Sequence, residues 1–219
     1  ICSIVQNINS KSTNAILGRE FITVFGKDTI DDIMCGRRVT LSPASFYQVN
    51  TPQAQRLYQK AGEYAELKEG DILLDLYCGT GTIGLSLIKE GCRLIGADIV
   101  TSSIENAKRN AAQNGIKNAE FVCADAKDAA SLFFNRGERP DVIIADPARK
   151  GCDRQTLEYM AKMAKKRIVM ISCDHSTAAR DIAVLRELGF EMTKCCAVDL
   201  FPRTSHVECV SLLENRGKK

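Results

Sequence analysis

Segments with strand character and segments with helical character alternate from residue 72 onward, and this alternation limits the possible fold more than any other feature of the chain. The strand-like segments are short apolar runs rich in Ile, Leu and Val, typical of strands buried on both faces. Strands are predicted over residues 72–76, 94–98, 120–123, 142–145, 168–172, 192–200 and 206–213. Helices are predicted from residue 82, from residue 103, and over residues 126–134, 154–165 and 177–188. The pattern predicts an α/β fold built on a doubly wound, mostly parallel sheet of seven strands.

The last two predicted strands are joined only by residues 201–205. A parallel crossover needs roughly a dozen or more residues, so these two strands must pair antiparallel. A dinucleotide-binding domain repeats parallel units, whereas a terminal antiparallel hairpin is typical of class I S-adenosylmethionine-dependent methyltransferases. That comparison is an analogy of folds, and the residues of the site have to decide between the two.

Residues 1–50 follow a different pattern, with β-prone stretches over 21–25 and 38–41 broken by Asn, Gly, Asp and Ser. We interpret residues 1–50 as the end of a β-rich domain and residues 51–219 as a catalytic domain. A linking helix is predicted from Thr51, which can cap it, with Pro52 in its first turn. Because the chain opens with Ile1 inside an apolar run, we expect it to be the C-terminal piece of a longer protein.

Composition narrows the class of protein. Hydrophobic residues make up 45% and charged residues 26%, as in globular domains, and no apolar run reaches the ~18 residues of a membrane span. Ten cysteines in 219 residues, without a leader sequence, favour a reduced, cytoplasmic protein over a disulfide scaffold. The net charge of +3 neither requires nor excludes a polyanionic partner. We expect a monomer that needs no metal and no membrane.

A glycine motif of the form G-x-G-x-x-G follows the first strand of the alternating region, at Gly79, Gly81 and Gly84. Glycines at a junction between a strand and a helix permit a tight turn and a close approach of the backbone to a ligand. Asp98 ends the next strand 19 residues after Gly79, close to the ~20 residues expected for an acid that binds ribose hydroxyls. This pattern alone fits an NAD site as well as an S-adenosylmethionine site.

Acidic residues follow four successive strands, and they favour the second cofactor. They are Asp75, Asp98, Asp125 and Asp146, all expected at the carboxyl edge of the sheet, where open α/β folds bind ligands. Asp75 would repel the pyrophosphate of a dinucleotide but would attract a sulfonium or an amino group. The alternative for each acid is a helix cap or a solvated side chain, and Asp125 fits that alternative best.

Cys173 and Glu208 are the candidate reactive residues. Cys173 ends the fifth strand just ahead of a helix, and a helix N-terminus favours the nucleophilic thiolate. Glu208 begins the seventh strand, which we expect beside the fourth and fifth, so the two side chains would share a cleft with the cofactor. The alternative for Cys173 is that of a small buried hydrophobic residue.

Five motifs that occur in order between about residues 41 and 213 resemble the RNA uracil-C5 methyltransferase family, most of all the bacterial 23S rRNA 5-methyluridine enzymes. They are Phe46-Tyr-Gln48-Val-Asn50, Asp75-Leu-Tyr77-Cys-Gly-Thr-Gly81, Asp146-Pro-Ala-Arg149-Lys-Gly151, Ser172-Cys173 with Thr177-Ala-Ala-Arg180-Asp181, and Asp199-Leu-Phe-Pro202-Arg-Thr204-Ser-His206-Val-Glu208.

The resemblance implies that Cys173 is the nucleophile and Glu208 the general base. It also implies that an S-adenosylmethionine site is lined by Gln48, Tyr77, Asp98 and Asp146. Gly79, Gly81 and Asp125 complete the cofactor site that we expect, and Arg149 and His206 are candidate substrate contacts.

Three positions depart from the family pattern. Ala148 stands where the family usually has a second proline, Asp98 where it often has Glu, and Asp174-His175 where it commonly has Asn-Pro. The last difference bears most on the reaction, because it alters the setting of the Cys173 thiol.

The expected partner is RNA, whose target uridine must leave its stack to reach the pocket. We expect a uridine of 23S rRNA, with transfer RNA as the alternative substrate. An NAD-dependent oxidoreductase and a catalytically silent RNA-binding protein are the competing functions. The oxidoreductase would leave Cys173 and Glu208 without a role.

Overall fold

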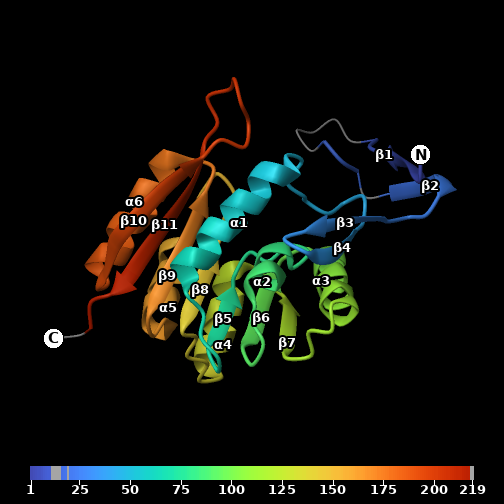
Figure 1. Ribbon diagram of the computed structural model, residues 1–219. Coiled ribbons are helices and arrows are strands. Elements are labelled where there is room, and N and C mark those ends of the chain that lie inside the picture. Colours follow the sequence, from blue (N-terminus) through green and yellow to red (C-terminus); the bar gives the residue numbers. More distant parts are fainter. Residues whose placement is uncertain (11–15, 19, 218–219) are drawn as a thin grey trace.

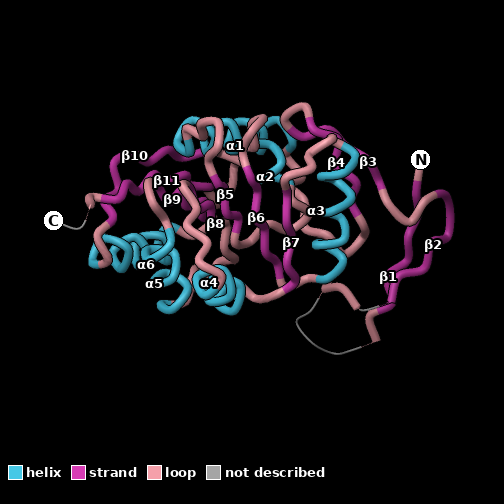
Figure 2. Tube along the Cα trace, turned by 90° about the horizontal axis from the view of Figure 1, so that it is seen from below, coloured by secondary structure: helices cyan, strands magenta, loops and turns pink. Residues whose placement is uncertain are grey.

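The computed structural model describes residues 1–10, 16–18 and 20–217. A seven-stranded sheet, with helices on both faces, forms the larger part of the molecule (Figures 1 and 2). Its strands are β5 (Ile72–Asp75), β6 (Arg93–Asp98), β7 (Ala119–Cys123), β8 (Val142–Ala145), β9 (Arg167–Ser172), β10 (Phe190–Val198) and β11 (Glu208–Asn215). The helices are α1 (Thr51–Ala65), α2 (Thr82–Leu87), α3 (Thr101–Gln113), α4 (Ala126–Asn135), α5 (Arg154–Met163) and α6 (His175–Glu187). The predicted α/β fold is confirmed, with most element bounds within a few residues of the expected ones.

The strand order is β10-β11-β9-β8-β5-β6-β7. The five strands from β5 to β9 pair in parallel, and β11 is antiparallel to both of its neighbours, β9 and β10. The terminal antiparallel pair is therefore confirmed. The expectation that the last strand lies beside both the fourth and the fifth strand was wrong in one respect, because β11 pairs with β9 and not with β8.

Each face of the sheet carries its own hydrophobic core. Helices α1, α2 and α3 cover one face of the sheet, and α4, α5 and α6 cover the other (Figure 2). Leu73 belongs to the core on the first face, and its neighbour Leu74 belongs to the core on the second. Successive side chains of a strand point to opposite faces, so continuous apolar runs are required in strands covered on both sides. Burial on both faces therefore explains why the continuous apolar runs in the sequence predicted the parallel strands correctly.

Two small hairpins precede the sheet. The first pairs β1 (Ser3–Ile8) with β2 (Glu20–Gly26), and the second pairs β3 (Ile30–Met34) with β4 (Arg37–Leu41). The sequence predicted β2 and β4 but not β3, whose central residues are the two acids Asp31 and Asp32. Apolar side chains on β1 and β2 remain exposed, whereas Val39 of β4 is fully buried against the main core.

Amides of α3 fasten β4 to the rest of the molecule. Asn110 is fully buried; its side-chain oxygen accepts from the Thr40 backbone N–H at 2.8 Å, and its Nδ2 donates to the backbone oxygens of Thr40 and Thr80 at 3.3 and 3.0 Å. Asn106 Nδ2 donates to the hydroxyls of Ser42 and Ser45 at 2.7 and 2.9 Å. The segment after β4 and the glycine loop are thereby held on one helix.

The linking helix α1 starts as predicted, but Asn50 rather than Thr51 caps it. Asn50 Oδ1 accepts from the backbone N–H of Gln53 at 3.4 Å, and its Nδ2 donates to the Leu200 carbonyl at 2.8 Å. The Asn50 side chain therefore caps α1 and also links the segment that carries Gln48 to the connection between β10 and β11.

We predict that Asn110→Ala lowers the free energy of unfolding by about 3 kcal/mol, because it leaves buried backbone groups of Thr40 and Thr80 without partners. Urea denaturation followed by circular dichroism measures this loss. The exposed Asn135 at the end of α4 provides the matched control, and Asn135→Ala should change stability by less than about 0.5 kcal/mol. Equal losses in the two variants would contradict the fastening role of Asn110.

Candidate active site

The predicted site residues gather at one edge of the sheet. Asp75 ends β5, Asp146 directly follows β8, and Cys173 directly follows β9. Parallel strands end at the same edge. Glu208 is the first residue of β11, which runs in the opposite direction, so the start of this strand meets the ends of the others. The topology therefore brings residues from distant parts of the sequence to one place.

The glycine loop, residues 79–84, is a tight turn with open space beside Gly79. Gly79 and Gly81 have φ values of +52° and +80°, which side chains rarely adopt. A Cβ atom on Gly79 would meet nothing within 4 Å, whereas one on Gly84 would collide with Leu94 at 2.8 Å. Gly79 therefore leaves room for a ligand, and Gly84 allows close packing between the helix and the sheet.

Asp98 supports the turn from the neighbouring strand. Its Oδ2 accepts from the Gly79 backbone N–H at 3.0 Å and its Oδ1 from the Val100 N–H at 2.8 Å. The carboxylate is partly exposed beside the loop, as expected for an acid that binds a ligand there.

Three carboxyl groups at the edge are poorly supplied with hydrogen-bond donors. Asp75 is completely buried; its Oδ2 accepts from Gly84 N–H at 3.1 Å, but its Oδ1 has no partner among the described residues. Burial raises the pKa of Asp75 to about 7. Burial, with the charges of Glu208 and Asp75, also raises the pKa of Asp146 to about 7. Burial raises the pKa of Glu208, which Arg149 partly offsets. The edge is suited to a cationic or hydrogen-donating ligand.

Gln48 and Tyr77, the other two predicted cofactor residues, come from different segments of the chain. Gln48 is 6% exposed, and its amide makes no hydrogen bond to any described residue, so it is free to bind a ligand. Tyr77, in contrast, donates its hydroxyl hydrogen to Cys152 Sγ at 3.4 Å. The Tyr77 hydroxyl is therefore engaged with the segment before α5.

Cys173 is partly exposed at the predicted place, but its thiol is not activated as expected. Burial and the charges of Glu208 and Asp146 raise the pKa of the thiol, and Arg149 lowers it. The net direction of the shift is therefore opposite to the activation expected from the helix N-terminus. Asp174 caps the helix, because its Oδ1 accepts from the Ser176 and Thr177 N–H groups at 3.0 and 2.9 Å.

The remaining candidates lie at the margin. Asp125 is exposed and caps α4 through a bond from the Asp128 N–H to its Oδ1 at 3.0 Å, the alternative that its position already allowed. Arg149 is exposed, and its charge acts on both Cys173 and Glu208. His206 is exposed and meets the Phe201 ring edge to face, with 6.4 Å between the centroids.

Sequence reasoning missed Tyr58 of α1, which lies under the site. Its side chain is 4% exposed, and the charges of Asp146 and Asp75 add to burial in raising its pKa. Tyr58 is next to Leu57 in an amphipathic helix and was indistinguishable from an ordinary core residue.

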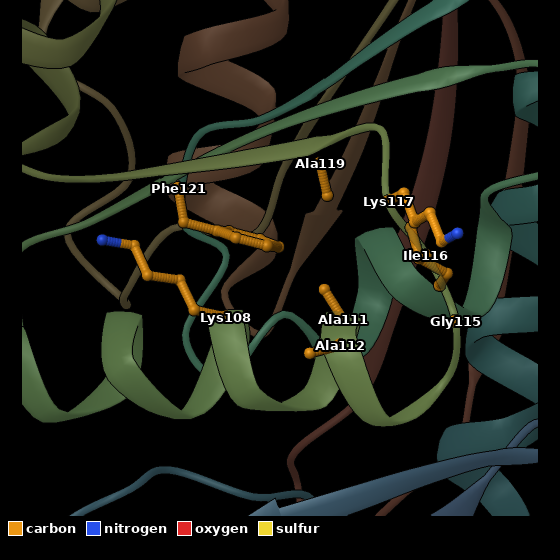
Figure 3. Close-up of a pocket in the computed structure, with 8 residues that line it drawn as sticks. All are labelled: Lys108, Ala111, Ala112, Gly115, Ile116, Lys117, Ala119 and Phe121. Atoms are coloured by element: carbon orange, nitrogen blue, oxygen red, sulfur yellow. The ribbon is translucent and has the colours of Figure 1, made fainter.

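A pocket of about 460 Å³ lies elsewhere, between α3 and the start of β7 (Figure 3). Lys108 and Lys117 stand at its sides and Phe121 forms part of its wall. None of the predicted site residues lines it. The candidate site therefore rests on the convergence of side chains at the sheet edge and not on this pocket.

Solved structures with this fold define the class of the protein. The chain resembles a Pyrococcus abyssi tRNA (uracil-54, C5)-methyltransferase, crystallised with S-adenosyl-L-homocysteine, with a TM-score of 0.81 and 30% identity over 97% of this chain and 50% of that one. An S-adenosylmethionine-dependent methyltransferase of Agrobacterium tumefaciens matches with a TM-score of 0.68 at 15% identity, over 89% of this chain and 73% of that one, which shows the fold alone. The fold is that of the class I methyltransferases.

Sequence relatives identify the family. The tRNA (uracil-5-)-methyltransferase family model matches residues 9–216, and the chain belongs to this family. An uncharacterized RNA methyltransferase of Clostridium tetani is 44% identical over the whole chain and 48% of its own length. One of Streptococcus mutans is 46% identical over 96% of the chain and 47% of its own length. The chain thus spans about half the length of these curated relatives. Within the described residues, no helix combines the length and the apolar character that a membrane crossing needs.

We predict that Asp75→Asn flattens the pH dependence of stability. A buried carboxyl whose pKa is raised from 3.8 to about 7 holds its proton in the folded state and loses it in the unfolded state, so wild-type stability falls as pH rises through this range. Between pH 5 and pH 8 the variant should lose about 2–3 kcal/mol less than the wild type. Urea midpoints at the two pH values measure the difference. Asp28→Asn, at an exposed turn, should retain the wild-type dependence, and an unchanged slope in Asp75→Asn would show that the buried acid does not titrate there.

Proposed function

We propose that this protein transfers a methyl group from S-adenosylmethionine to C5 of a uridine in RNA, through a covalent adduct between Cys173 and C6 of the base. The observation that carries the proposal is the meeting of a partly exposed thiol, Cys173, with the carboxyl groups of Glu208 and Asp146 at the carboxyl edge of the sheet. Membership of the family supports the same chemistry. We further propose that residues 51–219 form the catalytic domain and residues 1–50 the end of a β-rich domain.

The residues at the edge fit S-adenosylmethionine. The unpartnered Asp75 Oδ1 and the acidic surroundings of Asp146 suit a ligand with an amino group and a sulfonium charge. Asp98 beside the open glycine turn suits ribose hydroxyls, and the free amide of Gln48 offers a further polar contact. When bound, this cofactor supplies the methyl group as an electrophile and leaves as S-adenosylhomocysteine.

Cys173 makes the base reactive. C5 of uracil is a weak nucleophile, and addition of the thiolate to C6 moves the electrons of the C5=C6 bond onto C5 and the adjoining carbonyl. The thiol must first lose its proton, which its raised pKa opposes. Arg149 is the positive side chain that lowers this pKa, so we assign it to stabilising the thiolate.

Glu208 completes the reaction as the general base. Once C5 carries the methyl group, its hydrogen has to leave as a proton; Glu208 accepts it, the C5=C6 bond forms again and the bond from Sγ to C6 breaks. Burial raises the pKa of Glu208 and makes its carboxylate a stronger base. His206 and the adjoining Phe201 lie at the margin where an unstacked base would enter, and we assign them to substrate contact.

The covalent step is tested with RNA that contains 5-fluorouridine, whose fluorine cannot leave as a proton does. We expect the wild-type protein, with S-adenosylmethionine, to form an adduct that survives denaturing electrophoresis. Cys173→Ala should form none, whereas Cys123→Ala, which removes an exposed cysteine at the end of β7, should form as much as the wild type.

A complementary variant separates the two roles. Glu208→Gln should accumulate the same adduct on RNA with ordinary uridine, because the thiol can add but the C5 proton has no acceptor. An adduct that persists in Cys173→Ala would refute the assignment of Cys173 as the nucleophile. Methylation by Glu208→Gln at the wild-type rate would refute the assignment of Glu208 as the general base.

The substrate we propose is 23S rRNA, as the motifs suggest. Transfer RNA is the second candidate, favoured by the similarity to the Pyrococcus abyssi enzyme. Unmodified transcripts of both RNAs, incubated with radiolabelled S-adenosylmethionine, should yield 5-methyluridine in the rRNA at one mapped position. Label in tRNA alone would assign the protein to the second substrate. Binding of RNA without any label would favour the silent RNA-binding function and refute methyl transfer.

A further inference from the structure

An ion pair on α6, between the exposed Arg180 and the buried Asp181, contacts the loop that follows Asp146. Asp181 is 1% exposed, and its Oδ1 accepts from Arg180 Nε and Nη2 at 2.9 and 2.7 Å. Its Oδ2 accepts from the Cys152 backbone N–H at 2.7 Å. Arg180 Nη2 also donates to the backbone oxygens of Lys150 and Cys152 at 2.8 and 3.2 Å. We call this arrangement of Arg180, Asp181 and the gripped backbone the clasp.

The loop is shaped to fit the clasp. Gly151 has φ +71°, and a Cβ on it would lie 2.5 Å from both Arg180 Nη2 and Asp181 Oδ2. The Gly151 N–H donates to the Ala148 carbonyl at 2.8 Å, which closes a turn around Arg149 and Lys150. Only glycine allows the backbone to approach the ion pair this closely.

The clasp joins the two segments that carry reactive groups. The loop begins at Asp146 and includes Arg149; α6 begins two residues after Cys173. A charged pair with three hydrogen bonds to the backbone is more than is needed to cap a loop that is otherwise exposed. Its effect is to fix the Arg149 turn relative to the start of α6.

We propose that Arg180 and Asp181 are positioning residues, which hold the Arg149 guanidinium where its charge acts on the Cys173 thiol. The inference rests on the proposed role of Cys173. It assigns to the clasp an effect on thiol reactivity, which a purely structural ion pair would not have.

Several charged groups surround the Cys173 thiol. Glu208 faces it from β11 and Asp146 from the loop, and both carboxylates raise its pKa. Arg149 opposes them. Asp174 and His175 adjoin it at the start of α6. Since Arg149 is the cation that lowers the thiol pKa, displacement of its turn should make the thiolate scarcer.

The test is the pH dependence of Cys173 alkylation by iodoacetamide, resolved by peptide mass spectrometry, with exposed Cys123 as the internal reference. Asp181→Asn keeps the size of the side chain but weakens the clasp. We expect alkylation of Cys173 at pH 7.5 to slow about three- to tenfold and the apparent thiol pKa to rise by roughly half to one unit. Removal of a nearby negative charge would by itself lower that pKa, so the sign separates positioning from a direct charge effect.

Three further variants make the test decisive. Glu187→Gln makes the same type of change at an exposed site on α6 and should leave the profile unchanged. Arg180→Lys keeps the charge but cannot bridge the same acceptors, and it replaces Asp181→Asn if that variant does not fold. In an Arg149→Met background the clasp variant should cause no further shift.

An unchanged or lowered thiol pKa in the clasp variants, or an equal rise in the Arg149→Met background, would overturn the inference. This measurement needs neither RNA nor S-adenosylmethionine. Failure of the positioning role is therefore distinguishable from failure of the proposed methyl transfer, which the 5-fluorouridine adduct reports separately.

Discussion

The gathering of three carboxyl groups at one edge of the sheet is the condition that the rest of this structure has to satisfy. Asp75 and Glu208 are buried and Asp146 is only partly exposed, an arrangement that costs free energy. The two hydrophobic cores offset this cost by fixing the strands from both faces. One oxygen of these carboxyl groups, Asp75 Oδ1, has no hydrogen-bond partner among the described residues.

The sequence was sufficient for the sheet and its helices because each strand is buried on both faces and must be apolar throughout. It was insufficient for β3, where the two adjacent acids Asp31 and Asp32 interrupt the apolar residues of a hairpin outside the main sheet. Helix caps were the other limit. Asn50 caps α1 by accepting a hydrogen bond from the Gln53 backbone N–H, and the neighbouring Thr51 fits the same cap pattern in the sequence.

In the candidate site, the positions of residues at the ends of predicted strands indicated which side chains would meet. Those positions did not indicate how the charges of the side chains would interact. Cys173 lies where expected, yet burial and the two carboxylates Glu208 and Asp146 raise the pKa of its thiol, opposite to the effect expected from a helix N-terminus. Tyr58 escaped notice, and Arg180 and Asp181 were noted only as part of a motif, because the significance of all three depends on tertiary contacts. The same contacts explain the glycine at position 151, which the sequence offered only as part of a motif.

The position of β11 has a consequence for the order in which the molecule can be assembled. β11 follows every other strand in the sequence, yet it lies between β9 and β10, and β10 has no other partner in the sheet. Until residues 208–215 have been synthesised, β10 cannot join the sheet and the carboxylate of Glu208 does not exist. A nascent chain can therefore form the glycine loop and the strand that precedes Cys173 before Glu208 is available to join them at the same edge of the sheet. The separation in time between these events is set by the strand order itself.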